Sequence, residues 1–198
     1  MNDLTLYLFA AFAVQNLVLT TGFGSSLMLR IVRRPREMAG FSLLLTVFAV
    51  LTVLGAYPVD GLISRQLGTS TLIQMLRPLA VVAVVIVIYI FIVLVTRIFL
   101  RRLYKHINRL LGLAAFNNLT VGVALIAEHN LALNLLQSIG LAVGAGLGFF
   151  LLSWLTIEAR DRAENPDVPP SFRGLPVTLL YLGILGMALM GFGKGSLI

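Results

Sequence analysis

The chain has 198 residues, of which 59% are hydrophobic and 12% charged, with a mean hydropathy of +0.97 and a net charge of +7. A soluble domain carries about 25% charged residues, so the composition excludes an ordinary soluble protein and indicates an integral membrane protein. The basic residues lie between apolar blocks, which argues against nucleic-acid binding. The absence of cysteine excludes disulfides, thiolate nucleophiles and sulfur-ligated metal sites in this chain.

Six apolar segments follow one another along the chain. Each has about the 20 residues that a transmembrane helix needs, and all are longer than the roughly 10-residue alternating strands of a membrane barrel. We therefore predict an all-α integral membrane protein that forms one six-span domain over residues 1–198. The predicted spans, with limits good to a few residues, are about 5–29, 38–57, 78–98, 110–127, 131–155 and 175–193.

The first span contains Gln15, Asn16 and then TTGFGSS (20–26), a stretch with two glycines and four hydroxyl groups. Glycine costs about 1 kcal/mol against alanine inside a helix in water. Irregular backbone at membrane depth persists only where it is buried in protein or lines a cavity. The stretch therefore predicts a broken helix that faces the interior of the bundle.

The fourth span contains the adjacent amides Asn117 and Asn118 in an apolar run, FNNLTVG (116–122). An amide without a hydrogen-bond partner in an apolar medium costs roughly 4–8 kcal/mol. We expect both asparagines to face the interior opposite residues 20–26, and Gln15 and Asn16 to face it from the other side. The alternative is that these amides only join helices, through hydrogen bonds worth about 0.6–2 kcal/mol each.

The two halves of the chain share a pattern. An amide pair, a leucine, a threonine and a glycine recur in the first and fourth spans, and Arg77 and Arg173 stand at the entries of the third and sixth. Three spans per half give the halves opposite orientations, so we predict two inverted repeats of about 1–100 and 101–198, with broken helices in spans one and four.

The basic residues divide unevenly between the two sides of the membrane. Only Arg65, Arg77 and Lys194 lie on the side that carries the termini, and the positive-inside rule therefore places both termini outside the cytoplasm. The basic loops are expected to contact anionic lipid or an acidic soluble partner. The residues on the cytoplasmic side are Arg30, Arg33, Arg34, Arg36, Arg97, Arg101, Arg102, Lys105, Arg109, Arg160, Arg162 and Arg173.

Several other features predict packing rather than chemistry. Gly140, Gly144 and Gly148 form a small-residue face on the fifth span that lets another helix approach closely, and the glycines of the sixth span, from Gly183 onward, suggest a counterpart. Glu128 is expected to be a solvated loop carboxylate. The span centres lack the acidic, lysine or histidine side chain typical of proton pumps, and no self-sufficient active site is recognisable.

Four stretches together resemble the RnfA/NqrE branch of the Rnf/Nqr ion-translocating oxidoreductase membrane-subunit family: FAVQNLVL (12–19), FNNLTVGVAL (116–125), DVPPSFRG (167–174) and LMGFG (189–193). The resemblance implies a six-span, inverted-repeat subunit of a bacterial inner (cytoplasmic) membrane complex, with periplasmic termini and a homologous, oppositely oriented partner. Such complexes pass electrons from NADH or ferredoxin through flavins and iron–sulfur centres in partner subunits and couple this to sodium or proton movement.

The resemblance also implies an intramembrane [2Fe–2S] cluster, held by a cysteine from the first and fourth spans of each paired subunit. The matching positions hold Ser26 (or Ser25) and Asn118, which are poor substitutes for thiolates. We therefore expect this divergent chain to bind no cofactor or metal itself and to contain no catalytic residue. The predicted midplane polar site consists of Gln15, Asn16, Ser25, Ser26, Asn117 and Asn118.

The leading prediction is a non-catalytic membrane subunit of a divergent Rnf/Nqr-type complex, which scaffolds the transmembrane electron and ion path. Its cytoplasmic loops would dock redox subunits. Two alternatives stay open at this point: a stand-alone dimeric inverted-repeat transporter or channel, and a purely structural assembly subunit.

Overall fold

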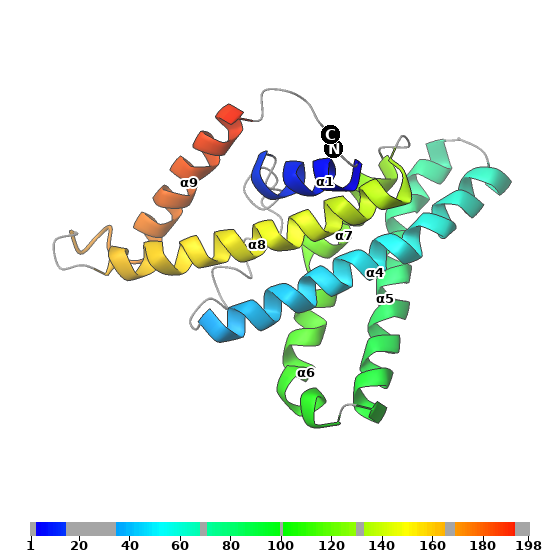
Figure 1. Ribbon diagram of the computed structural model, residues 1–198, viewed down its shortest axis with the longest axis horizontal. Helices are drawn as coiled ribbons and strands as arrows, with labels where there is room; N and C mark the ends of the chain where they lie inside the picture. Colours follow the sequence, from blue (N-terminus) through cyan, green and yellow to red (C-terminus); the bar gives the residue numbers. More distant parts are fainter. Residues whose placement is uncertain are drawn as a thin grey trace.

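The structure is a computed structural model that describes residues 3–14, 35–67, 71–99, 101–129, 133–164 and 169–192 (Figure 1). These ranges contain helices joined by turns and no strands, which confirms the all-α class. The helices are α1 (Asp3–Phe9), the π-helix η1 (Ala10–Val14), α4 (Pro35–Leu67), α5 (Thr71–Phe99), α6 (Arg101–Ala115), α7 (Asn118–His129), α8 (Leu135–Ala163) and α9 (Leu175–Phe192).

Four helical segments are long and apolar enough to cross a membrane, and they correspond to the second to fifth predicted spans. They are Met38–Ile63, Met75–Phe99, Ile107–Glu128 and Leu135–Ala163. The sixth predicted span corresponds to α9, whose apolar stretch Leu175–Leu189 is shorter. Most of the first predicted span lies outside the described residues. The chain is thus a multi-pass helical membrane protein, while the total of six spans and the inverted repeats stay predictions.

Several helices extend beyond the predicted span ends, α8 through to Ala163 and α4 and α5 at their connection. Helix α4 continues through Pro58 to Leu67, and α5 begins at Thr71, before Pro78. The approximate span limits at 57 and 78 therefore do not mark helix ends, and the apolar segments themselves run to Ile63 and from Met75. Proline removes one backbone hydrogen bond, but neighbouring groups in a membrane protein can compensate for the loss.

The core lies where α4 crosses α8, with α7 packed against both helices. Phe41 of α4 and Phe149 of α8 are buried, and their ring centroids lie 5.7 Å apart at an interplanar angle of 59°. Leu45 and Phe48 of α4 are also fully buried. In Figure 1, α1 lies along α8, and α5 and α6 project together away from it. This arrangement places the middle of the fourth span against α4.

The glycines of α8 allow a close helix contact, as the sequence predicts. A Cβ on Gly140 would lie 2.6 Å from the carbonyl oxygen of Leu4, and one on Gly144 would overlap the carbonyl oxygen of Leu8. On α9, by contrast, a Cβ on Gly183 or Gly186 would meet no described atom within 4 Å. The predicted counterpart face therefore has no partner helix within the described part of this chain.

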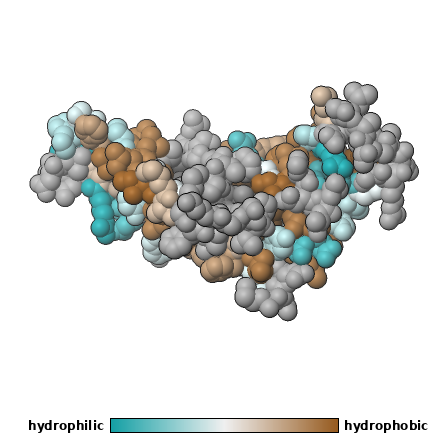
Figure 2. Space-filling model, turned by 90° about the horizontal axis from the view of Figure 1, so that it is seen from above, coloured by the Kyte–Doolittle hydropathy of each residue, from teal (hydrophilic) through white to brown (hydrophobic). Residues whose placement is uncertain are grey.

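Patches of apolar side chains are visible on the face shown in Figure 2. Helix α5 contributes many apolar side chains to the surface, including Met75, Leu79, Val87, Phe91 and Phe99, all well exposed. In water such a surface would be costly, so the acyl chains of the bilayer are its natural solvent. Clusters of polar side chains among the described residues are therefore the features to consider as functional sites.

Candidate functional site

The fourth span is a broken helix, as the sequence predicts. Helix α6 ends at Ala115 and α7 begins at Asn118, so the break lies near the middle of the apolar segment Ile107–Glu128. The Phe116 N–H still donates to the Gly112 carbonyl at 3.1 Å, and the Val121 N–H donates to the Asn117 carbonyl at 3.2 Å. Between these two bonds the regular helical pattern is interrupted.

Two side chains from the same short stretch compensate for the interruption. The Asn117 Oδ1 accepts a hydrogen bond of 3.0 Å from the Leu119 N–H, as a residue that caps a helix N-terminus does. The Thr120 hydroxyl donates to the Ala114 carbonyl at 2.9 Å. Both bonds are buried, so the break is a defined geometry that local residues hold in place.

The two adjacent asparagines point in different directions. Asn117 is only 1% exposed, and its Nδ2 has no hydrogen-bond partner among the described residues. Asn118 is exposed on the surface of the chain. Within the described chain Asn117 is therefore buried and Asn118 is exposed, while the expected position of both amides opposite residues 20–26 stays a prediction. Neighbouring positions of a helix differ by about 100° in direction, so burying one amide turns the other outward.

The other members of the predicted midplane site are Gln15, Asn16, Ser25 and Ser26. All four lie outside the described residues. The meeting of polar groups from the first and fourth spans therefore stays a prediction.

Large apolar or aromatic side chains of the described residues lie near the break. Phe116 is exposed and packs against Tyr89 of α5, with ring centroids 5.3 Å apart. Leu113, one turn earlier on α6, is exposed as well. Asn118 is thus an outward-facing amide beside large apolar side chains, at a depth where lipid offers no hydrogen bond.

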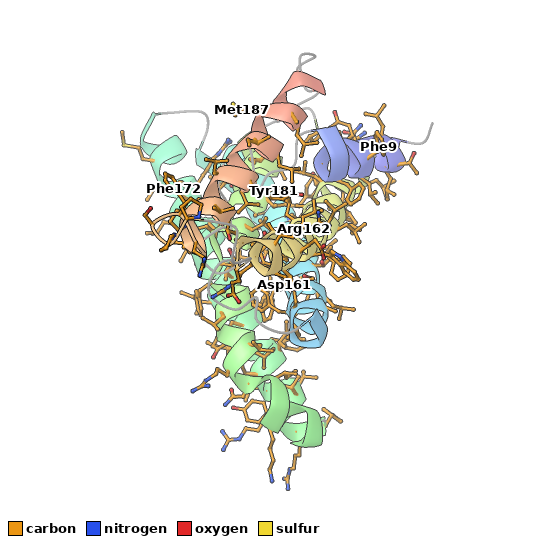
Figure 3. The ribbon with its side chains drawn as sticks, turned by 90° about the vertical axis from the view of Figure 1, so that its left-hand side faces the viewer. Phe9, Asp161, Arg162, Phe172, Tyr181 and Met187 are labelled. Carbon is orange, nitrogen blue, oxygen red and sulfur yellow. The ribbon has the colours of Figure 1, made fainter. Side chains whose placement is uncertain are left out.

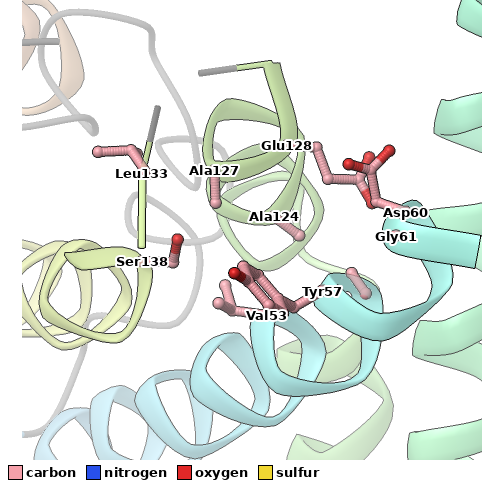
Figure 4. A pocket seen from close by; sticks show the side chains of 10 residues that line it. Val53, Tyr57, Asp60, Gly61, Ala124, Ala127, Glu128, Leu133 and Ser138 are labelled. Carbon is pink, nitrogen blue, oxygen red and sulfur yellow. The ribbon is translucent and has the colours of Figure 1, made fainter. Parts of the chain in front are cut away.

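A second polar cluster lies at the other end of α7, around a pocket of about 250 Å³ (Figure 4). Asp60 of α4 forms an ion pair with Arg77 of α5, with 3.2 Å between Oδ1 and Nε and side chains only 15% and 16% exposed. Figure 4 shows the Glu128 carboxylate beside that of Asp60. The Glu128 Oε2 is buried with no hydrogen-bond partner among the described residues. Glu128 is thus partly buried at the end of a helix, and its expected position in a solvated loop is wrong.

Sequence reasoning missed the Asp60–Arg77 pair, because it ended the second span before Asp60. A usable signal was present: Asp60 and Arg77 flank the connection between two apolar spans, where antiparallel helices bring their ends together. Among the described residues the cluster brings together two carboxyl groups and one guanidinium. No group of three or more metal-ligating side chains occurs in the part of the chain that the structure describes, so the pocket is not a recognisable metal centre.

The fold and the capped break define a class: multi-pass helical membrane proteins with a discontinuous helix at mid-depth. Comparison with known proteins then specifies the family. The protein-family model described as "Rnf-Nqr subunit, membrane protein" matches residues 4–195 of the chain. The chain therefore belongs to this family.

Individual relatives agree with this assignment. One of them, a component of the ion-translocating oxidoreductase complex of Pseudomonas paraeruginosa, is 29% identical over 192 residues, which cover 97% of each chain. The component of the same name from Vibrio cholerae serotype O1 (strain ATCC 39315) is 30% identical over 192 residues, again with 97% of each chain covered. The resemblance inferred from the four motifs is thereby confirmed.

Proposed function

We propose that this chain is a non-catalytic membrane subunit of a divergent Rnf/Nqr-type complex, in the inner membrane of a bacterium. It scaffolds the transmembrane electron and ion path beside a homologous, oppositely oriented subunit. The family match over nearly the whole chain supports the assignment to such a complex. The amide at the break of the fourth span, where the family resemblance calls for a thiolate, supports the divergence.

The residues present do not fit a [2Fe–2S] cluster. Such clusters are held by cysteine thiolates, with histidine as an occasional replacement. The chain contains no cysteine, and the first residue of α7 is Asn118, whose amide is neither anionic nor soft. Flavin and iron–sulfur centres therefore belong to other subunits in this proposal.

The surface at the break is the proposed contact with the homologous partner. Asn118 is exposed there beside Phe116 and Leu113. Lipid would leave the amide unpaired at a cost of several kcal/mol, whereas a partner helix with a polar group would satisfy it. The buried hydrogen bonds of Asn117 and Thr120 hold Asn118 in place for that contact.

Purification of the tagged chain from its native membrane tests the proposal. We expect flavoprotein and ferredoxin-like subunits to co-purify, and the preparation to show NADH- or ferredoxin-dependent electron transfer. Isolation as a lone homodimer that transports a solute in liposomes would overturn the proposal in favour of a carrier or channel. A stoichiometric iron and sulfide content in the isolated chain would refute the missing-ligand argument.

A gain-of-ligand experiment tests the proposed cluster positions. In the complex, the double variant Ser26→Cys/Asn118→Cys is expected to raise iron content, because it restores both ligands beside a partner that supplies its own cysteines. The matched variant Ser25→Cys/Asn118→Cys distinguishes the two candidate serines. If neither variant raises iron content, the proposed correspondence of positions is wrong.

The proposed orientation places both termini in the periplasm. Because the chain lacks cysteine, a single introduced thiol reports its side of the membrane. Asn134 precedes α8, and Asp161 lies in the last turn of that helix (Figure 3). A membrane-impermeant thiol reagent should label Asn134→Cys in intact spheroplasts and Asp161→Cys only after permeabilisation. The opposite labelling pattern would invert the topology.

A further inference from the structure

A basic and apolar crevice lies where α5 turns into α6. It has a volume of about 600 Å³ and is lined by Leu94, Arg97, Ile98, Arg101, Tyr104 and Lys105. It is remote from the break of the fourth span and belongs to neither polar cluster described above.

The positive charge of the crevice is uncompensated within the described chain. Arg97, Arg101 and Lys105 are exposed, and none of them is ion-paired with a described carboxylate. The sequence contains no aspartate or glutamate from residue 61 to residue 127. Figure 3 shows nitrogen-bearing side chains gathered at the tip of the α5–α6 hairpin. The crevice therefore favours an anionic ligand.

The other wall of the crevice is apolar and continuous with the lipid-facing side of α5. Leu94 is 51% exposed and Ile98 is 63% exposed. Both belong to the apolar segment Met75–Phe99, whereas Arg101 and Lys105 lie beyond its end. The crevice thus crosses the boundary between hydrocarbon and headgroup region, where arginine and lysine stems lie on apolar surface with their charges in the polar layer.

We propose that this crevice binds an anionic phospholipid from the leaflet at which α5 and α6 meet. Arg97, Arg101 and Lys105 contact the headgroup phosphate, and an acyl chain packs on Leu94 and Ile98. A soluble acidic protein could neutralise the three cations, but it could not cover side chains that lie within the membrane-spanning segment. The combination of charge and depth therefore selects lipid as the occupant.

A fluorescence experiment on the reconstituted full chain tests the proposal. Trp154 is the only tryptophan, so Trp154→Phe combined with Tyr104→Trp places a single fluorophore in the crevice. The vesicles contain phosphatidylcholine with a minor fraction of phosphatidylglycerol. In one preparation only the phosphatidylcholine is brominated, and in the other only the phosphatidylglycerol. Brominated phosphatidylglycerol is expected to quench several-fold more than its mole fraction predicts. Arg97→Gln/Arg101→Gln/Lys105→Gln should abolish the excess, at about fivefold in affinity for each charge removed.

A charge-matched control is available. Arg109→Gln/Arg160→Gln/Arg162→Gln removes three basic side chains that do not line the crevice, and it should retain the excess quenching. Glycerol 3-phosphate in solution should not reduce the quenching, because it lacks the acyl chain. Quenching at the bulk mole fraction in the reporter chain would overturn the proposal. An equal loss of the excess quenching in both triple variants would also overturn the proposal. The same holds for a crevice variant that keeps the excess quenching and loses only the binding of a soluble subunit.

Discussion

The contact between α1 and α8 gives a quantitative prediction. A Cβ on Gly144 would overlap the Leu8 carbonyl oxygen and lie 2.8 Å from the Ala11 Cβ. The carbonyl belongs to the backbone and cannot rotate away, so Gly144→Ala must displace α1 from α8. Overpacking of this kind costs about 1–3 kcal/mol. Gly183→Ala is the matched control, because a Cβ there meets no described atom within 4 Å.

The two substitutions make the same chemical change inside a helix, so the roughly 1 kcal/mol that alanine gains in helix propensity cancels between them. The remaining difference is the packing cost. The assay measures the apparent melting temperature in mild detergent. The signal is the fraction of protein that stays monodisperse after heating. At about 2–4 °C per kcal/mol for a chain of this size, Gly144→Ala should melt roughly 2–12 °C below Gly183→Ala. Equal melting temperatures would refute the close contact between α1 and α8.

The remaining predictions use the same thermal assay. Arg77→Gln removes the described ion-pair partner of the Asp60 carboxylate and should cost about 1–3 kcal/mol, between the values for exposed and buried pairs. The double variant Asp60→Asn/Arg77→Gln should recover part of this loss, and an additive loss would contradict the pairing. Asn117→Ala removes a helix cap and should cost about 1 kcal/mol; Thr120→Val should cost about 1–3 kcal/mol, because it leaves a buried carbonyl unpaired. Asn118→Ala should change stability by less than about 0.5 kcal/mol but weaken retention of the homologous partner; a stability loss equal to that of Asn117→Ala would contradict its outward position.

Local chemistry explains what the sequence predicts correctly. Apolar length places the helices that correspond to the second to fifth spans, because a span must satisfy its own backbone hydrogen bonds. A break in the fourth span was predicted because its polar pattern repeats that of the first span, and the local hydrogen bonds of Asn117 and Thr120 fix its position. The close approach of a helix to Gly140 and Gly144 followed from side-chain size, although the sequence did not identify that helix as α1.

Non-local packing explains what the sequence does not give. The ion pair of Asp60 with Arg77 depends on how far α4 and α5 continue past their prolines, which tertiary contacts decide. The partial burial of Glu128 depends on α4 and the start of α8, which line the pocket at the end of α7. The absence of a described neighbour for Gly183 could not be foreseen either, since a small-residue face does not specify which helix will cover it.

The two adjacent asparagines at the break contribute differently to the structure. A helix interruption that served only structure would need one capping amide, and Asn117 supplies it with its side chain buried. Asn118 makes no described contribution to that cap, yet it stands exposed at mid-depth beside Phe116. Hydrocarbon penalises such an amide by several kcal/mol, which is more than a helix cap provides. The second asparagine is therefore best explained by a polar group outside the described residues, which in this proposal lies at the face where the related subunits pair.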